Sequence, residues 1–209
     1  MSKQAAQSTT NQITEGVIWK QLLIFFFPIL FGTFFQQLYN TADAIIVGNF
    51  VGKEALASVG GSASTIINLL VGFFVGLSSG ATVIISQYYG ADNRRRVRDS
   101  VHTAIALAIA GGVVIMLLGL VSARFALTAM GTPDDILSLS LTYMKIYYLG
   151  TIPSMIYNMG SGILRALGDS RATLYFLLVS SVLNVVLDLL FVAGFHMGVA
   201  GAAIATVLS

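Results

Sequence analysis

The chain has 209 residues, of which 56% are hydrophobic and 10% are charged, and its mean hydropathy is +0.84. Soluble domains carry roughly 25% charged residues, and disordered chains combine low hydrophobicity with high net charge, so both classes are excluded. The net charge of +2 gives no indication of a nucleic-acid partner, and we expect none. The absence of cysteine excludes disulfides, thiol nucleophiles and Cys-ligated metals. The lipid bilayer is therefore the expected solvent.

Charges divide the chain into apolar stretches that are long enough for membrane-spanning helices of about 20 residues. Asp43 is the one charge between Lys20 and Lys53, and Asp188 is the one charge after Arg171. The pattern predicts an all-α integral membrane protein with helices at about 18–46, 55–82, 99–122, 139–164, 170–192 and 198–209. Residues 17–209 then form one transmembrane bundle, preceded by a polar tail at residues 1–16. The last helix covers about half a crossing, so we expect the chain to be a piece of a longer protein.

Basic residues predict the orientation of these helices, because cytoplasmic segments are enriched in Lys and Arg. With the tail inside, the inner segments hold eight basic residues and the outer segments hold three. We therefore expect a multi-pass protein of the cell membrane (inner or plasma membrane) with a cytoplasmic N-terminus. The four arginines at positions 94, 95, 96 and 98 are explained best as a topology signal, with binding of anionic lipid headgroups as the alternative.

Proline and glycine mark special positions within the predicted helices. Pro28 and Pro153 each leave a backbone carbonyl without its donor and permit a bend, and Pro28 is our candidate hinge. Gly72, Gly76 and Gly80 recur every four residues, which predicts a face where another helix packs closely.

Two carboxylates fall inside predicted spans, where each costs about 2.5–3.5 kcal/mol on insertion scales. Asp43 continues a polar helix face that also carries Thr33, Gln36, Gln37 and Asn40, and Asp188 follows Asn184 by one turn on the fifth helix. Counting a rise of about 1.5 Å per residue places both acids in the outer half of the bilayer. Thr206 enters from the outer side to a similar depth. We expect these side chains to form one cluster.

Such a cluster can bind a proton or a small cation, because two carboxylates in a low dielectric cannot both stay ionised without a counter-ion. A sodium ion would take oxygen ligands, and the candidates are Asp43, Asn184, Asp188 and Thr206. Cavity-lining candidates are Gln36, Tyr39 and Asn40. The alternative is that each acid only fixes helix packing, and packing is the favoured role for Tyr39. No cofactor other than the coupling ion is expected, and the absence of nucleophile and phosphate-loop motifs argues against an enzyme.

Several segments resemble multidrug and toxic compound extrusion (MATE) transporters. Thr14-Glu15-Gly16, the run from Trp19 to Leu23 with Pro28, and Gln36 to Asn40 with Asp43 are similar to the start of that family. The run from Ser161 to Asp169 resembles the loop after the fourth helix of the family. The run from Leu183 to Asp188, followed by Gly198 to Thr206, resembles helices 5 and 6 of the first half. The similarity extends from about residue 14 to the end.

The resemblance implies a fold of twelve helices in two six-helix bundles related by a pseudo-two-fold axis, of which this chain would be the first. It also implies export of amphipathic, often cationic drugs in exchange for protons or sodium. The implied cation-coupling residues are Asp43, Asn158, Asn184, Asp188 and Thr206, and Pro28 matches the proline at which helix 1 bends on protonation. The second bundle is absent from the sequence, so the implied partner is either the missing half or a second copy of this chain.

Two other functions remain open on the sequence. A flippase for lipids or lipid-linked sugars shares the superfamily plan, although a more cationic cavity would be expected. An intramembrane aspartyl protease also needs two acids, but it uses Tyr-Asp and Gly-x-Gly-Asp motifs. Asp43 follows Thr41-Ala42 and Asp188 follows Val186-Leu187, so the protease is disfavoured.

Overall fold

The structure, a computed structural model, describes residues 18–209, and the tail expected at residues 1–16 lies outside them. Every regular element of the described part is helical. The elements are α1 (Ile18–Phe50), α2 (Lys53–Gly60), α3 (Ser62–Gly90), α4 (Arg94–Ala129), α5 (Asp134–Leu149), α6 (Thr151–Ala166), α7 (Ser170–Asp188), the π-helix η1 (Leu189–Gly194) and α8 (Gly198–Leu208).

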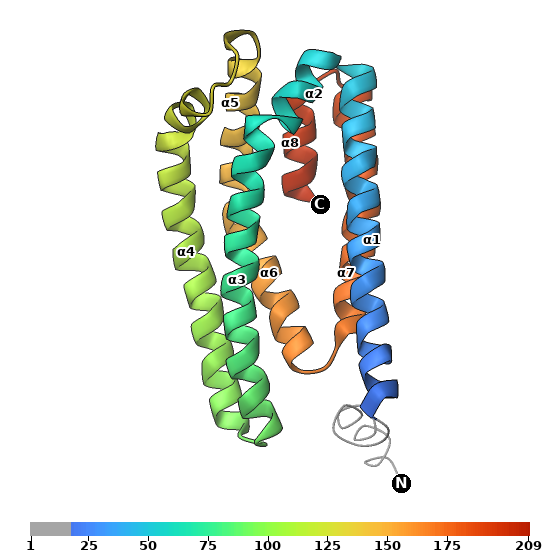
Figure 1. Cartoon of the computed structure of the whole chain (residues 1–209), viewed down its shortest axis with the longest axis vertical. Coiled ribbons are helices and arrows are strands. Elements are labelled where there is room, and N and C mark those ends of the chain that lie inside the picture. Colours follow the sequence, from blue (N-terminus) through green and yellow to red (C-terminus); the bar gives the residue numbers. More distant parts are fainter. Residues whose placement is uncertain (1–17) are drawn as a thin grey trace.

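The helices run along one long axis, as Figure 1 shows. α1 packs along α7, while α3, α4 and α6 pack against one another. The short helix α2 lies at the end of the bundle where α1 finishes, and α8 runs from that end back into the bundle. The α1/α7 pair and the α3/α4/α6 group are therefore joined mainly at the end that holds α2, the start of α5 and the start of α8.

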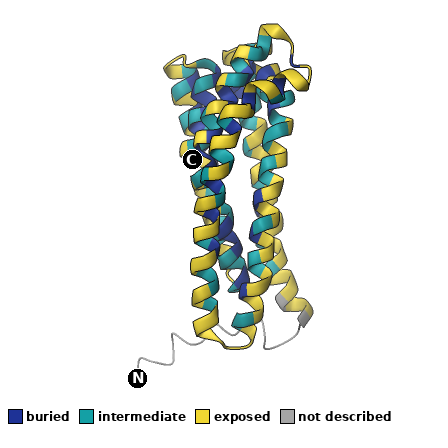
Figure 2. Ribbon diagram, turned by 90° about the vertical axis from the view of Figure 1, so that its left-hand side faces the viewer, coloured by how far each residue is buried: buried dark blue, intermediate teal, exposed yellow. Residues whose placement is uncertain are grey.

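Four segments of the described chain are long and apolar enough to cross a membrane: Leu22–Phe50, Lys53–Gly90, Arg94–Ala129 and Ser170–Gly194. Large apolar side chains cover the outer faces, where Val121 is 87% exposed and Phe125 is 78% exposed. Figure 2 shows these exposed faces running the length of the bundle. Apolar groups are stable on such a surface only in lipid, and the expected all-α membrane bundle is confirmed.

The single helix expected at 139–164 is wrong, because the structure has two 16-residue helices, α5 and α6, that meet at Gly150. Pro153 has no backbone N–H to donate to the carbonyl of Leu149, four residues earlier. The N–H of Gly150 instead donates to the carbonyl of Tyr147 at 3.0 Å, in a tight turn. The break therefore lies just before the proline that the sequence had marked as a bend.

α4 is longer than the expected 99–122, because the helix continues through polar residues on both sides of its apolar stretch. Asn93 caps its start by accepting a hydrogen bond from the N–H of Arg96 at 3.1 Å. Asp169 caps α7 in the same way, through the N–H of Ala172 at 2.9 Å. Both caps lie at the end of the bundle where α1 begins (Figure 1).

The glycine face expected on α3 is not a packing face in this chain. A Cβ built on Gly72, Gly76 or Gly80 meets nothing within 4 Å. α3 packs instead through its opposite side, where Phe74 and Ile85 are buried. Close approach of small residues occurs on α4, where a Cβ on Gly119 would lie 2.1 Å from Cε1 of Tyr148.

The buried apolar residues form two clusters. The larger one holds Ile46, Val47, Leu127, Tyr143 and Val192, and it draws on α1, α2, α3, α4, α5, η1 and α8 at one end of the bundle. The smaller one holds Phe74, Ala104, Ala108, Met155 and Met159, all on α3, α4 and α6. α1 and α7 contribute no buried residue to this second cluster, which leaves room for a cavity beside them.

Candidate functional site

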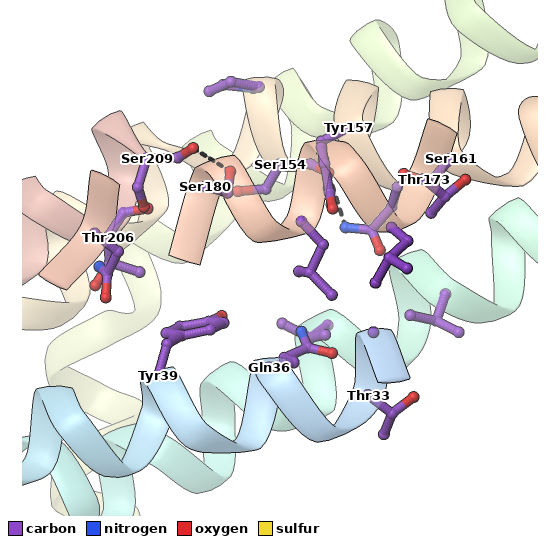
Figure 3. A pocket seen from close by; sticks show the side chains of 18 of the residues that line it. Thr33, Gln36, Tyr39, Ser154, Tyr157, Ser161, Thr173, Ser180, Thr206 and Ser209 are labelled. Carbon is purple, nitrogen blue, oxygen red and sulfur yellow. Dashed lines mark hydrogen bonds between the residues drawn. The ribbon is translucent and has the colours of Figure 1, made fainter. Parts of the chain in front are cut away.

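A cavity of about 680 Å³ lies between the α1/α7 pair and α6, with α3, α5 and α8 completing its walls. Figure 3 shows Gln36 and Tyr39 extending from α1 toward Ser154 and Tyr157 on the opposite wall. The hydroxyl of Ser180 donates to the carbonyl of Ser209 at the α8 side. The polar side chains on the walls are Thr33, Gln36, Tyr39, Tyr147, Ser154, Tyr157, Asn158, Ser161, Arg165, Ser170, Thr173, Ser180, Asn184, Thr206 and Ser209.

The two intramembrane acids meet beside this cavity. The carboxyl groups of Asp43 on α1 and Asp188 on α7 lie close enough to interact electrostatically. Asp188 is fully buried, and Asp43 is partly buried. No N–H or O–H group of the described chain donates to Asp43 Oδ1 or to either carboxyl oxygen of Asp188. Two carboxyl groups this close in a low dielectric cannot both stay ionised without a counter-ion, so the pair is suited to hold a proton or to bind a cation.

Asn184 lies one turn before Asp188 on α7 and is 1% exposed. It lines the cavity, and neither its amide oxygen nor its amide nitrogen has a hydrogen-bond partner among the described residues. A buried amide without partners costs about 1–3 kcal/mol. Asn184 therefore adds an unpaired oxygen between the cavity and the carboxyl pair.

Asn158 and Thr206 also line the cavity, but their donors are used within their own helices. Asn158 Nδ2 donates to the carbonyl of Ser154 at 2.8 Å. Thr206 Oγ1 donates to the carbonyl of Ala202 at 3.0 Å. The side-chain oxygen of each residue keeps lone pairs that can accept a hydrogen bond or coordinate a cation.

Apart from Asp43, which lies beside the cavity, four residues of α1 were singled out from the sequence, and three of them line the cavity. Pro28, Gln36 and Tyr39 line the cavity, whereas Asn40 does not and is exposed. Asn40 lies one residue after Tyr39, which turns it by about 100° around the helix. Asn40 was counted as part of the polar face because it lies four residues after Gln36 and three before Asp43.

The sequence reasoning missed a polar face on α6. Ser154, Tyr157, Ser161 and Arg165 line the cavity at steps of three and four residues, and this spacing was visible in the sequence. It also missed Tyr143 on α5, which is 6% exposed and lies close enough to Asp43 and Asp188 to interact electrostatically with both. A tyrosine in an apolar helix gives no such signal, because core packing produces the same pattern.

The site offers oxygen ligands to a hard cation. No group of three or more His, Cys, Asp or Glu side chains gathers anywhere in residues 18–209. Two carboxyl groups and an amide oxygen suit a proton or a sodium ion, because hard cations prefer oxygen. Among the residues lining the cavity itself, Arg165 carries the only charge.

Comparison with known proteins shows the family to which the chain belongs. The family model described as MatE matches residues 28–190. The chain belongs to the MatE family. Members of this family are transporters and not enzymes, and the resemblance to MATE transporters expected from the sequence is confirmed.

Similar curated proteins include two from Bacillus subtilis (strain 168). The chain is 34% identical over 196 residues to the "Probable multidrug resistance protein YpnP", covering 94% of this chain and 44% of that protein. It is 30% identical over 204 residues to the "Probable multidrug resistance protein YoeA", covering 96% of this chain and 44% of that protein. The MatE chain therefore spans less than half the length of these relatives.

Solved structures agree with the fold. One is described as the outward-facing conformation of a multidrug resistance MATE family transporter, with a TM-score of 0.90, 29% identity and coverage of 96% of this chain and 44% of that one. Another is a MOP superfamily transporter from Pyrococcus furiosus, with a TM-score of 0.89, 29% identity and coverage of 96% of this chain and 44% of that one. Its description states that reverse polarity of its binding pocket suggests a different function. The MatE chain has the fold of about half of each.

Proposed function

We propose that this chain is the N-terminal half of a transporter that exports amphipathic, often cationic drugs by antiport with a proton or sodium ion. The observation that carries the proposal is a cluster of unpaired polar atoms. Five of the eight buried side-chain N and O atoms without a partner in the described residues belong to Asp43, Asn184 and Asp188. Stable proteins pair buried polar groups, so a concentration of unpaired ones marks a place where a ligand supplies the missing interaction.

Ion binding at this place is coupled to helix packing through α1 and α7. Asp43 lies on α1 and Asp188 on α7, and these helices pack along each other. A cation between the two carboxyl groups attracts both helices, whereas two bare carboxylates repel each other. The ion thus binds one packing of α1 and α7 more tightly than another, which is the requirement for coupling ion movement to a conformational change.

The proposed roles follow from the positions of the residues. Asp43, Asn184 and Asp188 hold the ion, with Thr206 adding a hydroxyl oxygen from α8 for sodium. Asn158 and the cavity residues Gln36 and Tyr39 line the approach to it. Pro28 lines the same cavity and is proposed as the hinge of α1, in a protein whose N-terminus lies in the cytoplasm and whose second half or second copy completes the drug pathway.

Dye efflux tests this proposal. The full-length transporter carrying Asp43→Asn or Asp188→Asn is expressed in cells that lack their own efflux pumps, and the rate of dye efflux is measured. We expect each change to abolish efflux at normal expression, because an amide cannot exchange a proton or balance the charge of sodium. Asp169→Asn is the matched control, since Asp169 lies in a loop and asparagine also caps helices. Undiminished efflux in both intramembrane variants would contradict the proposal.

A flippase for lipids or lipid-linked sugars is the second candidate, and one observation favours it. Arg165 is the only charged residue on the cavity wall, so the cavity itself offers a cation to its cargo and no carboxylate. A relative of the same fold is described as having a binding pocket of reversed polarity. If Arg165→Ala abolishes transport of an anionic lipid-linked sugar in vesicles while dye efflux is absent, the flippase replaces the drug exporter.

A further inference from the structure

A second hollow of about 550 Å³ forms a groove between α3 and α4. It shares no lining residue with the cavity described above. Its α3 wall includes Gly76, Gly80 and Ile84, and its α4 wall changes along its length from Arg96 and Asp99, through Ser100 and Thr103, to Ala104 and Leu107. The groove is open beside both glycines, where an added Cβ would meet nothing within 4 Å.

The groove has the length of one acyl chain in one leaflet. Its α3 wall extends from Gly76 to Tyr88, which is about 18 Å at a rise of about 1.5 Å per residue. Half of a hydrocarbon core of about 30 Å is about 15 Å. An apolar channel of this length, open to the bilayer, matches a single lipid tail.

One end of the groove carries a positive charge. Arg96 lines it there, with its guanidinium 5.4 Å from the centre of the Tyr88 ring and its Nη1 3.4 Å from the Tyr88 hydroxyl. The contact with Tyr88 holds the guanidinium at this end of the groove, and its remaining N–H groups suit two-point binding of a phosphate. Arg94 is not on the groove and pairs with Asp92 at 3.6 Å.

The depth of Arg96 fits a lipid headgroup. α4 carries no charge between Asp99 and Arg124, a stretch of about 36 Å by helix rise, which is enough to cross the hydrocarbon core. Arg96 lies just before this stretch, at headgroup level, while Thr103 and Leu107 line the groove within it. Asp99 lines the groove one turn beyond Arg96 and can accept hydrogen bonds from headgroup hydroxyls.

We propose that the α3/α4 groove binds one anionic glycerophospholipid, with a tail along Gly76 and Gly80 and its phosphate on Arg96. This site is separate from the ion site and does not depend on the proposed transport function. In this proposal, the open glycine face of α3 contacts the lipid tail and Arg96 contacts the headgroup of the same lipid.

Native mass spectrometry of the purified full-length transporter in detergent tests the proposal, with titrations of phosphatidylglycerol and phosphatidylcholine. We expect one phosphatidylglycerol per chain, held at least fivefold more tightly than phosphatidylcholine. Arg96→Ala lowers that affinity about fivefold, the scale of one basic residue at an anionic membrane surface. Arg94→Ala leaves it unchanged. Equal losses in the two variants would show general attraction by the arginine run and overturn the proposal.

A second pair of variants tests the groove itself. Gly80→Leu places a side chain in the groove, while Gly72→Leu adds the same side chain to the same open face of α3 outside the groove. Gly80→Leu is expected to abolish tight lipid binding, and Gly72→Leu to retain it. Equal lipid binding by both variants overturns the proposal, as does a dimer of chains that Gly80→Leu dissociates, because a second chain would then occupy the groove.

Discussion

The carboxyl group of Asp43 on α1 lies close enough to that of Asp188 on α7 for the two to interact electrostatically, and no group of the described chain donates a hydrogen bond to either Asp188 oxygen. An amide in place of one acid would supply that donor. We therefore expect Asp43→Asn to raise the thermal unfolding temperature in the absence of sodium, by an amount equal to about 0.5–1.5 kcal/mol of unfolding free energy for one new hydrogen bond. Circular dichroism during heating measures the change.

Asp43→Ala serves as its control, because it removes the repulsion without adding a donor. Its unfolding temperature is expected to rise by less than that of Asp43→Asn. If both variants unfold at or below the temperature of the parent protein, the carboxyl pair is already satisfied and our description of the site is wrong.

Gly119 of α4 packs against the ring of Tyr148 on α5. A methyl group there would lie 2.1 Å from Cε1 and 2.2 Å from Cδ1 of that ring. We expect Gly119→Ala to destabilise the bundle by about 1–3 kcal/mol, the usual cost of overpacking. Gly72→Ala, where the added Cβ meets nothing within 4 Å, should leave stability within about 0.5 kcal/mol. Equal unfolding temperatures in the two variants would place α4 and α5 further apart than described.

Pro28 lies inside α1 and cannot donate to the carbonyl of Ile24, four residues earlier. Pro28→Ala restores that hydrogen bond and should make bending of α1 harder. We expect transport by the full-length protein to fall at least fivefold while the unfolding temperature stays equal or rises. Pro133→Ala, in the loop before α5, is the control and should transport normally. A Pro28→Ala protein with full activity would remove the hinge from the mechanism.

The cysteine-free sequence allows a direct test of orientation. Ala91→Cys and Asp134→Cys each place a single thiol at an exposed position, at opposite ends of the bundle. If the N-terminus is cytoplasmic, a membrane-impermeant maleimide added to intact cells labels Asp134→Cys and not Ala91→Cys. Labelling of Ala91→Cys requires permeabilised cells. The reverse labelling pattern would show that the N-terminus lies on the outer side of the membrane.

Much of this architecture follows from the sequence for a simple physical reason: a bilayer demands long apolar helices, and charges mark where they end. That rule predicted α1, α4 and α7, but it merged α2 and α3, which are separated at Gly61, into one helix at 55–82. Nor could it locate helix ends that lie outside the lipid, such as Arg94 and Ala129 of α4. It also marked Pro153 as a bend without predicting the full break at Gly150. The length of an apolar stretch does not show where its backbone hydrogen bonds are interrupted.

The candidate site was likewise predicted only in part from the sequence. Asp43 and Asp188 stand out in the sequence because charge is costly in lipid, and the structure brings them together. Asn40 has the right polarity but lies outside the cavity, while Tyr143 lies beside both acids without any distinguishing pattern. The glycine face of α3 was predicted to pack against another helix, but the spacing of small residues shows only that this face carries no large side chains. It does not show which molecule lies against it.

The uneven placement of the apolar core has a mechanical consequence. Ile46 and Val47 anchor α1 in the large cluster at one end of the bundle, while the second cluster contains nothing from α1 or α7. Over most of their length these two helices face a cavity instead of interlocked side chains, so tilting them exposes little tightly packed surface. The α1/α7 pair is thus held firmly at the joined end and loosely at the other, so a change in packing at Asp43 and Asp188, near the joined end, is expected to tilt the pair as a unit relative to α3, α4 and α6.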